Sequence, residues 1–209
     1  MQEVIENEMP VDKQQVHADT NIFSVIKNRR ATREYLPKQV SKELIRSLIE
    51  YSILAPSAMN LQPWSFVVIQ NVKLLKEFSD EVKRQLFANS DFSKESGEYG
   101  VNFLDDPDFD VFHGASTLIV ICAKEKMHKE FNTESDCFLA AENLMLAATG
   151  MGLATCPIGL ATDFLCQQSL SKKFEIPEYF TPVLPIVVGY AGNHPIYIGR
   201  NPPIIKWVG

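Results

Sequence analysis

The sequence predicts one domain that mixes helices and strands, in the α/β or α+β class. Short apolar runs typical of buried strands alternate with segments of helical periodicity. The length of 209 residues suits one such domain. Hydrophobic residues make up 45% of the chain, as in soluble globular proteins. We expect the acidic, polar residues 1–20 to form a flexible arm and residues 21–209 to form the domain.

Apolar runs bounded by turn-forming residues predict the strands. A proline within the last run, Pro185, argues for an edge position or a break in that strand, because proline cannot donate a ladder hydrogen bond. The predicted strands are 64–69, 118–123, a short one beginning at 153–156, and 183–190.

Capping residues and one-sided apolar spacing predict the helices. Asn21 is a plausible N-cap for a short first helix, and Ser41 can cap a second whose apolar residues recur on one face. Amphipathic patterns predict further helices over 73–86 and 163–174.

The most pronounced helix begins with Thr133-x-x-Asp136, a pattern similar to a capping box, and ends at Gly150. It is apolar on nearly all sides and rich in alanine, which predicts a place in the core or in an interface. Glu142 lies within it, and we interpret this carboxylate as a structural partner of another side chain rather than a buried acid.

Residues 88–112 are polar, contain two glycines and carry several aromatic side chains. A long segment of this kind within a compact domain is typical of a lid or of a poorly ordered insertion. Our hypothesis is that it forms a mobile lid whose aromatic rings stack over a planar substrate.

Composition and missing motifs exclude several function classes. A formal net charge of -6 disfavours nucleic acid as a partner. The four histidines lack metal-ligand spacing, and the four cysteines form no C-x-x-C pair, so we expect no metal site and no disulfide. The sequence has no signal-peptide pattern and no membrane-spanning apolar run, which predicts a cytoplasmic protein. Rossmann, P-loop and G-x-S-x-G motifs are also absent from it.

Arginines gather just after the first predicted helix, at Arg29, Arg30 and Arg33. If the helical path continues, Arg29 and Arg33 share one side, where guanidinium groups suit bidentate contacts to a phosphate. A solvated basic face is the alternative. Another arginine, Arg200, follows near the C-terminus, where a single arginine is usually on the surface.

Two turn-like segments carry polar or small residues that could meet a ligand. In 55–64, Ser57, Asn60 and Gln62 can donate and accept hydrogen bonds, which suits the edge of a planar heterocycle. In 155–159, Gly159 would allow a backbone N–H to approach a ring. An ordinary turn is the alternative for each segment.

Taken in order, these segments resemble the nitroreductase family of flavoproteins over residues 21–208. The chain has Ala31 where the family often has serine, so one hydroxyl contact is missing, and Gly114-Ala115-Ser116 where G-A-P is common. The motifs that carry the resemblance are R-R-[SA]-x-R at 29–33, A-P-S-x-x-N-x-Q-P-W-x-F-V-V at 55–68, a small-residue helix ending G-x-G-L-x-T at 140–155, and G-Y at 189–190 followed by Arg-x-Pro at 200–202.

The resemblance implies an α+β fold, a three-layer α-β-α sandwich with a mixed, mainly antiparallel sheet, in an intertwined homodimer with two FMN sites. We expect the helix over 140–151 to form the dimer interface. No side chain is assigned a catalytic role, because the flavin carries the chemistry. The residues matching the family's FMN contacts are Arg29, Arg30, Ala31 and Arg33 (phosphate, ribityl chain and the N1/O2 side), Arg200 (phosphate), Ser57, Asn60 and Gln62 (flavin border, partly from the partner subunit), and Pro157, Ile158 and Gly159 (facing N5).

The function implied is an FMN-dependent oxidoreductase that uses NAD(P)H to reduce nitroaromatics, quinones or similar acceptors by ping-pong hydride transfer. One alternative is specialised flavin chemistry on the same fold, either reductive dehalogenation or flavin fragmentation. Another is a flavin-binding protein without turnover. The sequence does not choose between NADH and NADPH.

Overall fold

The computed structural model describes residues 21–88, 106, 108–125, 132–193, 195 and 199–209, so the predicted arm 1–20 lies outside the described part. Its centre is a four-stranded sheet in the order β1-β2-β4-β3. The strand pairs are all antiparallel, and an isolated bridge between Ala31 and Thr155 is parallel. The α+β class is therefore confirmed. The strands are β1 (Trp64–Ile69), β2 (Thr117–Lys124), β3 (Ala154–Pro157) and β4 (Phe180–Gly189).

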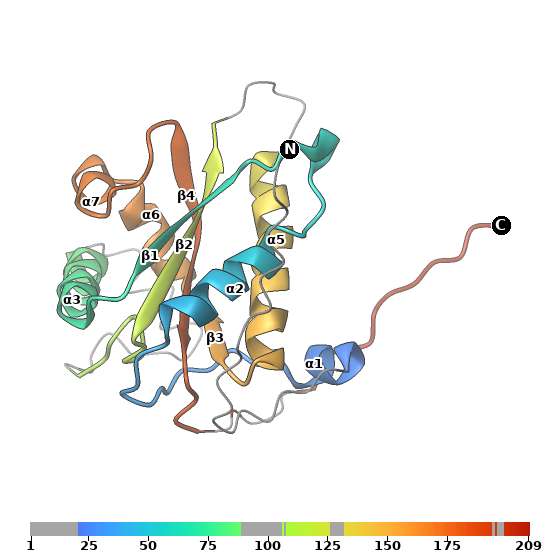
Figure 1. Cartoon of the computed structure of the whole chain (residues 1–209), viewed down its shortest axis with the longest axis horizontal. Coiled ribbons are helices and arrows are strands. Elements are labelled where there is room, and N and C mark those ends of the chain that lie inside the picture. The colour runs from blue at the N-terminus through green and yellow to red at the C-terminus, as the bar shows by residue number, and fades with distance from the viewer. Residues whose placement is uncertain (1–20, 89–105, 107, 126–131, 194, 196–198) are drawn as a thin grey trace, which may run out of the picture.

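Helices cover both faces of the sheet, which confirms the three layers (Figure 1). On one face lie α2 (Lys42–Ser52) and α5 (Thr133–Gly150), while the short α1 (Ile22–Asn28) packs against α5. The other face carries α3 (Val72–Ala88), α6 (Thr162–Leu165) and α7 (Gln168–Lys173). Among these described helices, none is long and apolar enough to cross a bilayer.

The central strand β2 shows why the fold has two cores. Its side chains alternate between the faces, as the twofold period of a strand requires. Both sets are buried because both faces are covered by helices. Leu118, Val120 and Cys122 belong to the core under α3, and Ile119, Ile121 and Ala123 belong to the core under α2 and α5.

Pro185 lies in the central strand β4, so the prediction of an edge position is wrong. Its carbonyl accepts a hydrogen bond from the N–H of Ile158 at 2.8 Å, just beyond the end of β3. In an antiparallel ladder the nitrogen and carbonyl of one residue face the same neighbour. The missing N–H therefore faces the side where β3 has ended. The β2–β4 register shifts at Val183, two residues before Pro185, but β4 runs unbroken from Phe180 to Gly189, so no break in the strand is found either.

The predicted caps are confirmed at two helices and displaced at a third. The Asn21 side chain accepts from the N–H of Phe23 at 3.0 Å, and Ser41 Oγ accepts from the N–H of Leu44 at 3.2 Å. For α5 the cap is Asn132, one residue before the predicted Thr133. The predicted helix 163–174 is divided into α6 and α7.

Candidate functional site

The arginine segment is extended rather than helical, because α1 ends at Asn28 and the backbone of Arg29 leaves the helical region. Ala31 forms the parallel bridge to Thr155, and the N–H of Thr32 donates to the carbonyl of Thr155 at 3.0 Å. Alternate residues of an extended chain share a side. Arg29 and Arg33 are thus expected on one side, although the reason differs from the predicted helical spacing.

Two of these arginines contact other groups of the same chain. Arg29 Nε lies 3.4 Å from a carboxylate oxygen of Glu142, which confirms Glu142 as a structural partner and not a buried acid. Arg30 donates to the carbonyl of Lys27 at 2.7 Å and to that of Arg29 at 2.8 Å. Arg30 therefore helps to satisfy the carbonyls at the end of α1.

Arg33 is exposed, and its charge acts on two neighbouring titratable groups. Burial raises the pKa of the Cys156 thiol, and the charges of Arg33 and Arg29 oppose that rise. Burial lowers the pKa of the His113 imidazole, and Arg33 lowers it further. The end of β3 and the turn before β2 thus lie within the positive field of the arginine segment.

The 157–159 segment lies at and just beyond the end of β3, two residues past the bridge between Ala31 and Thr155. Ile158 is buried, and its N–H is held by the carbonyl of Pro185. Gly159 begins the 3₁₀ turn η3 (Gly159–Ala161), and a Cβ built on it would have no neighbour within 4 Å. Gly159 therefore offers open backbone four residues beyond the bridge from Thr155 to the arginine segment. Open backbone together with a positive field suits an anionic ring edge.

The 55–62 loop turns through the 3₁₀ segment η1 (Ala58–Asn60) in a strained conformation. Met59, Asn60 and Gln62 have φ values of 51°, 55° and 46°. Each left-handed residue other than glycine costs about 1–2 kcal/mol. Ser57 Oγ accepts from the N–H of Gln62 at 3.0 Å, and the Gln62 amide donates to Asn60 Oδ1 at 3.2 Å. The predicted polar groups thus also hold the shape of their own loop.

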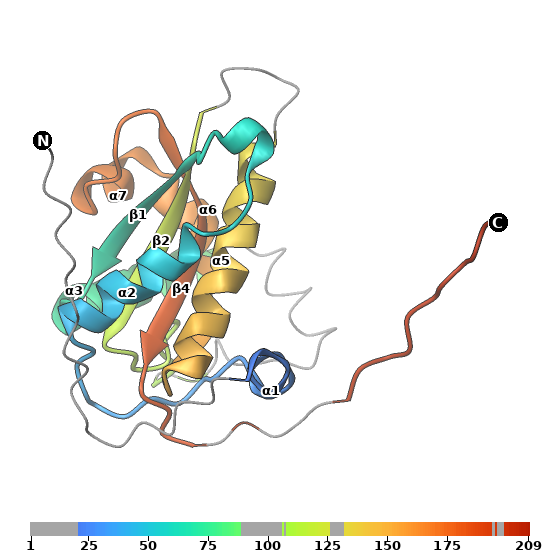
Figure 2. The same ribbon diagram turned by 45° about the vertical axis from the view of Figure 1, so that its right-hand side comes forward.

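The single chain does not bring all the predicted residues together. The loop meets α5 at its first turn, where the N–H of Ala58 donates to Asp136. The 31–32 segment instead pairs with Thr155, beyond the other end of α5. An 18-residue helix is about 27 Å long, and Figures 1 and 2 show η1 and α1 beside its opposite ends. Arg200 lies in the C-terminal segment 199–209, which extends away from the sheet.

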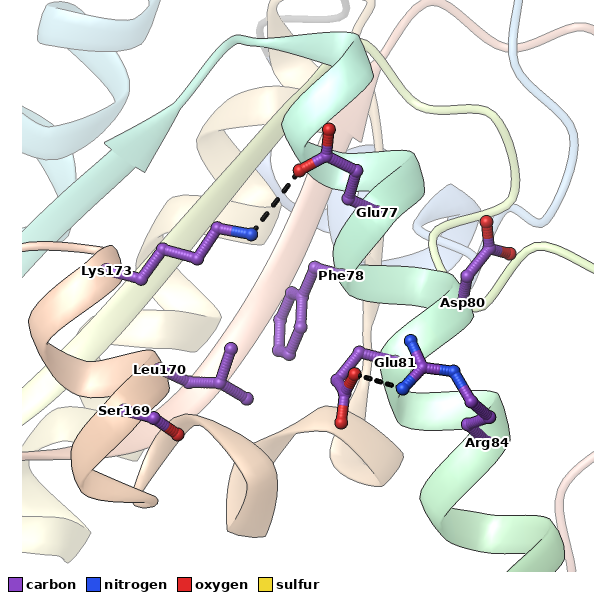
Figure 3. A pocket seen from close by; sticks show the side chains of 8 residues that line it. All are labelled: Glu77, Phe78, Asp80, Glu81, Arg84, Ser169, Leu170 and Lys173. Carbon is purple, nitrogen blue, oxygen red and sulfur yellow. Dashed lines mark hydrogen bonds and ion pairs between the residues drawn. The ribbon is translucent and has the colours of Figure 1, made fainter.

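A groove of about 520 Å³ lies elsewhere, between α3 and α7 (Figure 3). Charged pairs stand on its walls, with Lys173 3.4 Å from Glu77 and Arg84 2.6 Å from Glu81. It contains no predicted site residue. In the described part of the chain, no group of three metal-ligating side chains is present.

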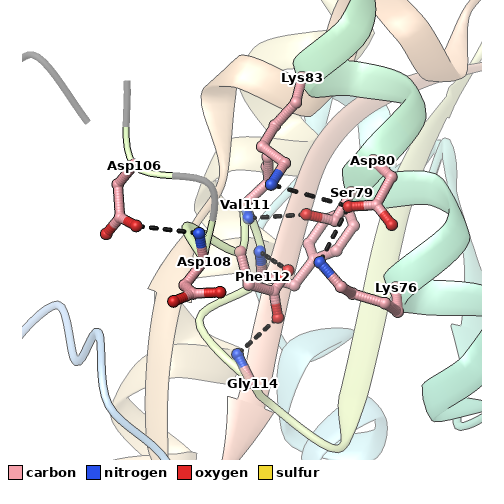
Figure 4. Close-up of polar contacts among 10 residues, drawn as sticks. Lys76, Ser79, Asp80, Lys83, Asp106, Asp108, Val111, Phe112 and Gly114 are labelled. Carbon is pink, nitrogen blue, oxygen red and sulfur yellow. Dashed lines mark hydrogen bonds and ion pairs between the residues drawn. The ribbon is translucent and has the colours of Figure 1, made fainter. Parts of the chain in front are cut away.

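The predicted lid 88–112 lies mostly outside the described residues. Its described end is part of the core, so the lid interpretation is wrong there. Phe112 is buried with its ring 5.2 Å from that of Phe78, and the N–H of Val111 donates to Ser79 Oγ at 2.9 Å. The Asp110 carboxylate accepts from the N–H groups of Phe112 and Gly114 and so fixes the turn that leads to β2 (Figure 4).

The sequence reasoning missed several exposed apolar side chains on α1, on α5, in the 54–61 segment and in the C-terminal segment. Phe23 on α1 is 79% exposed, and Phe138 and Leu139 on α5 are about half exposed. The sequence of α5, which is apolar on all sides, could have indicated that some of these side chains are exposed. Contiguous exposed apolar groups are typical of an interaction surface, and α1 and α5, which carry several of these side chains, pack against each other. Others in this set are Ile22, Ile26, Leu54, Met59, Leu61, Ile204, Ile205, Trp207 and Val208.

The chain is similar to known proteins in sequence and in fold. A putative NADH dehydrogenase/NAD(P)H nitroreductase of Methanothermobacter thermautotrophicus is 27% identical over 84% of this chain and 80% of its own. A 4-nitrobenzoate reductase of Pseudomonas putida is 29% identical over 72% and 76%. Among solved structures, a nitroreductase with bound FMN from Bacteroides fragilis superposes with a TM-score of 0.75 at 22% identity, covering 91% of this chain and all of that one. The model of the Nitroreductase family matches residues 26–190, and the chain therefore belongs to that family.

Proposed function

We propose that this protein is an FMN-dependent oxidoreductase that uses NAD(P)H to reduce acceptors such as nitroaromatics or quinones. The observation that carries the proposal is the parallel pairing of the arginine segment with β3, the strand that continues into the open backbone of Gly159. Relatives named NAD(P)H nitroreductase and 4-nitrobenzoate reductase, and a solved nitroreductase with bound FMN, support the same chemistry.

The residues present fit FMN. Arginine guanidinium groups suit a terminal phosphate, and a positive charge beside N1 and O2 favours an anionic ring edge. An exposed glycine backbone allows a flat ring to come close. Bound FMN would supply two-electron transfer between a nicotinamide and an acceptor, while the chain supplies binding, orientation and the electrostatic field of its arginines. Two half-reactions at one site give ping-pong kinetics.

We further propose a homodimer whose flavin sites combine residues from both subunits. The arginine segment and the 55–62 loop lie at opposite ends of α5. In a dimer, the 55–62 loop of one subunit could therefore complete the site formed by the arginine segment of the other. The exposed apolar side chains of α1, α5 and the C-terminal segment would be covered in the same assembly. Ala140, Ala141 and Ala148, however, are buried in the chain's own core, so the interface would use the Phe138–Leu139 side of α5.

The test begins with the purified protein. We expect it to be yellow, and we expect the chromophore released on denaturation to be FMN by chromatography and mass. Stopped-flow mixing with NADH and with NADPH should bleach the flavin band, and nitroaromatics or quinones should restore it. FAD as the chromophore, or colourless protein that binds no added FMN, would overturn the proposal.

A further inference from the structure

Asp136 is a buried carboxylate that interacts with the backbone of the 57–62 loop. It lies in the first turn of α5 and is 7% exposed. Its two oxygens lie 3.2 and 3.4 Å from the backbone nitrogen of Ala58. Within the described residues, no lysine or arginine forms an ion pair with it. The positive end of the α5 dipole helps to offset the cost of burying this charge.

The loop that Asp136 holds depends on this contact for its placement. Met59, Asn60 and Leu61 are exposed. The Ser57–Gln62 and Gln62–Asn60 hydrogen bonds run within the loop, so they fix its shape but not its position on the domain. Three residues of the loop other than glycine have a left-handed backbone, which is energetically unfavourable. The loop would therefore relax to other conformations unless its surroundings held it in place. The Ala58–Asp136 contact joins the middle of the loop to α5.

We propose that Asp136 is a positioning residue for the flavin site. It holds the 57–62 loop against α5 so that Ser57, Asn60 and Gln62 are presented in one fixed arrangement to the ligand. This inference rests on the proposed function. It adds a residue that does not touch FMN itself but determines where three proposed contacts lie.

A matched control exists on the same pair of helices. Ser52 Oγ donates to the carbonyl of Ala140 at 2.8 Å, and Ser52 is fully buried. This hydrogen bond ties α2 to α5 before the loop begins. Ser52→Ala therefore removes a buried tie between these helices without touching the loop.

The experiment compares Asp136→Ala, Asp136→Asn and Ser52→Ala in the full-length protein. FMN affinity is measured by fluorescence titration, and chymotrypsin cleavage after Leu61 is measured in the FMN-free protein. Asp136→Ala should weaken FMN binding by about tenfold, as expected for about 1.4 kcal/mol, and should speed cleavage. Asp136→Asn should stay within about twofold of wild type, because its Oδ1 can still accept from Ala58. Ser52→Ala should lose thermal stability but keep wild-type FMN affinity.

Each result decides the question. If wild type binds no FMN, the proposed function fails and this inference fails with it. If wild type binds FMN and Asp136→Ala binds it equally well, the inference alone is overturned. Equal losses in Asp136→Ala and Ser52→Ala would show a purely structural role. Should Asp136→Ala fail to fold, Ala58→Pro takes its place, because it removes the donor N–H at the first residue of η1 after an extended Ser57; a tenfold loss is again expected, and unchanged FMN affinity overturns the inference. A tenfold loss in Asp136→Asn would overturn the hydrogen-bond account.

Discussion

Gly189 closes β4 against the ring of Tyr35, and Gly189→Ala tests that contact. A Cβ built on Gly189 would lie 2.7 Å from Tyr35 Cδ1 and 3.4 Å from two further ring atoms. The ring cannot simply move aside, because its backbone is paired with the chain beyond β4. The N–H of Leu36 donates to the Tyr190 carbonyl at 2.9 Å, and the N–H of Gly192 donates to the Glu34 carbonyl at 2.8 Å.

The magnitude follows from two opposing effects. Forcing one methyl group into a packed core costs about 1–3 kcal/mol. Replacing glycine by alanine restricts the unfolded chain, which stabilises the fold by about 0.4–1 kcal/mol where the backbone permits. Overpacking wins, so Gly189→Ala should lower the free energy of unfolding by about 1–2 kcal/mol. Because Arg33 is two residues from Tyr35, FMN affinity should fall as well.

Denaturant unfolding measures the change in the free energy of unfolding. A double mutant tests whether that change comes from the contact between residue 189 and the Tyr35 ring. Tyr35→Leu in the Gly189→Ala background should recover stability relative to the sum of the single changes, since the clash needs both groups. Gly199→Ala is the control, because a Cβ there meets nothing within 4 Å. If Gly189→Ala is as stable as wild type, or if Tyr35→Leu brings no recovery, the packing argument is refuted.

The remaining predictions concern the ligand, the dimer and pH. Arg33→Ala and Arg200→Ala should each weaken FMN binding by about 1.5–3 kcal/mol, the range for a hydrogen bond to a charged group; unchanged affinity in both titrations would mean that their roles are wrongly assigned. Leu139→Arg, on the exposed side of α5, should give a folded monomer by light scattering and circular dichroism, whereas a wild-type monomer that retains FMN would remove the case for a dimer. His113 has a φ of 55°, which asparagine tolerates, so His113→Asn isolates its titration. Burial lowers the folded pKa of His113 below the unfolded value of about 6.5, so unfolding takes up a proton, and stability should fall as pH drops through about 6.5 towards the folded pKa. Denaturant unfolding of both proteins should show a smaller acid loss in His113→Asn, and an equal loss would contradict this reasoning.

The fold was largely predictable because its strands are short apolar runs and its helices carry local caps. Asn21 and Ser41 act through bonds two and three residues away, so sequence alone contains that information. The edge position predicted from Pro185 was wrong because a central strand can hold a proline where the neighbouring strand has ended. Where β3 ends is a property of the sheet and cannot be seen in the sequence of β4. The place of the 108–112 segment in the core was missed because its apolar residues follow a long polar run.

The candidate site was predictable as a set of residues but not as an arrangement. The motifs identify Arg33 and Gly159, and the structure brings their segments together through Thr155. Nothing in the spacing of the 55–62 loop shows that it meets the first turn of α5, because that contact is made by a backbone N–H, which every residue but proline carries. Asp136 was accordingly interpreted only as part of a helix start.

The helix α5 joins these separate parts of the molecule. One side supplies the core under β2, Asp136 holds the 57–62 loop, and Glu142 pairs with Arg29. Phe138 and Leu139 remain exposed between these contacts. A helix that is apolar on all sides therefore need not be buried wholly within one chain. The same helix contacts both sets of proposed ligand-binding residues. If its exposed side forms the dimer interface, assembly and cofactor binding would be linked. Because a ligand that binds only the assembled state stabilises that state, the proposed dimer and the proposed FMN site would depend on each other through α5.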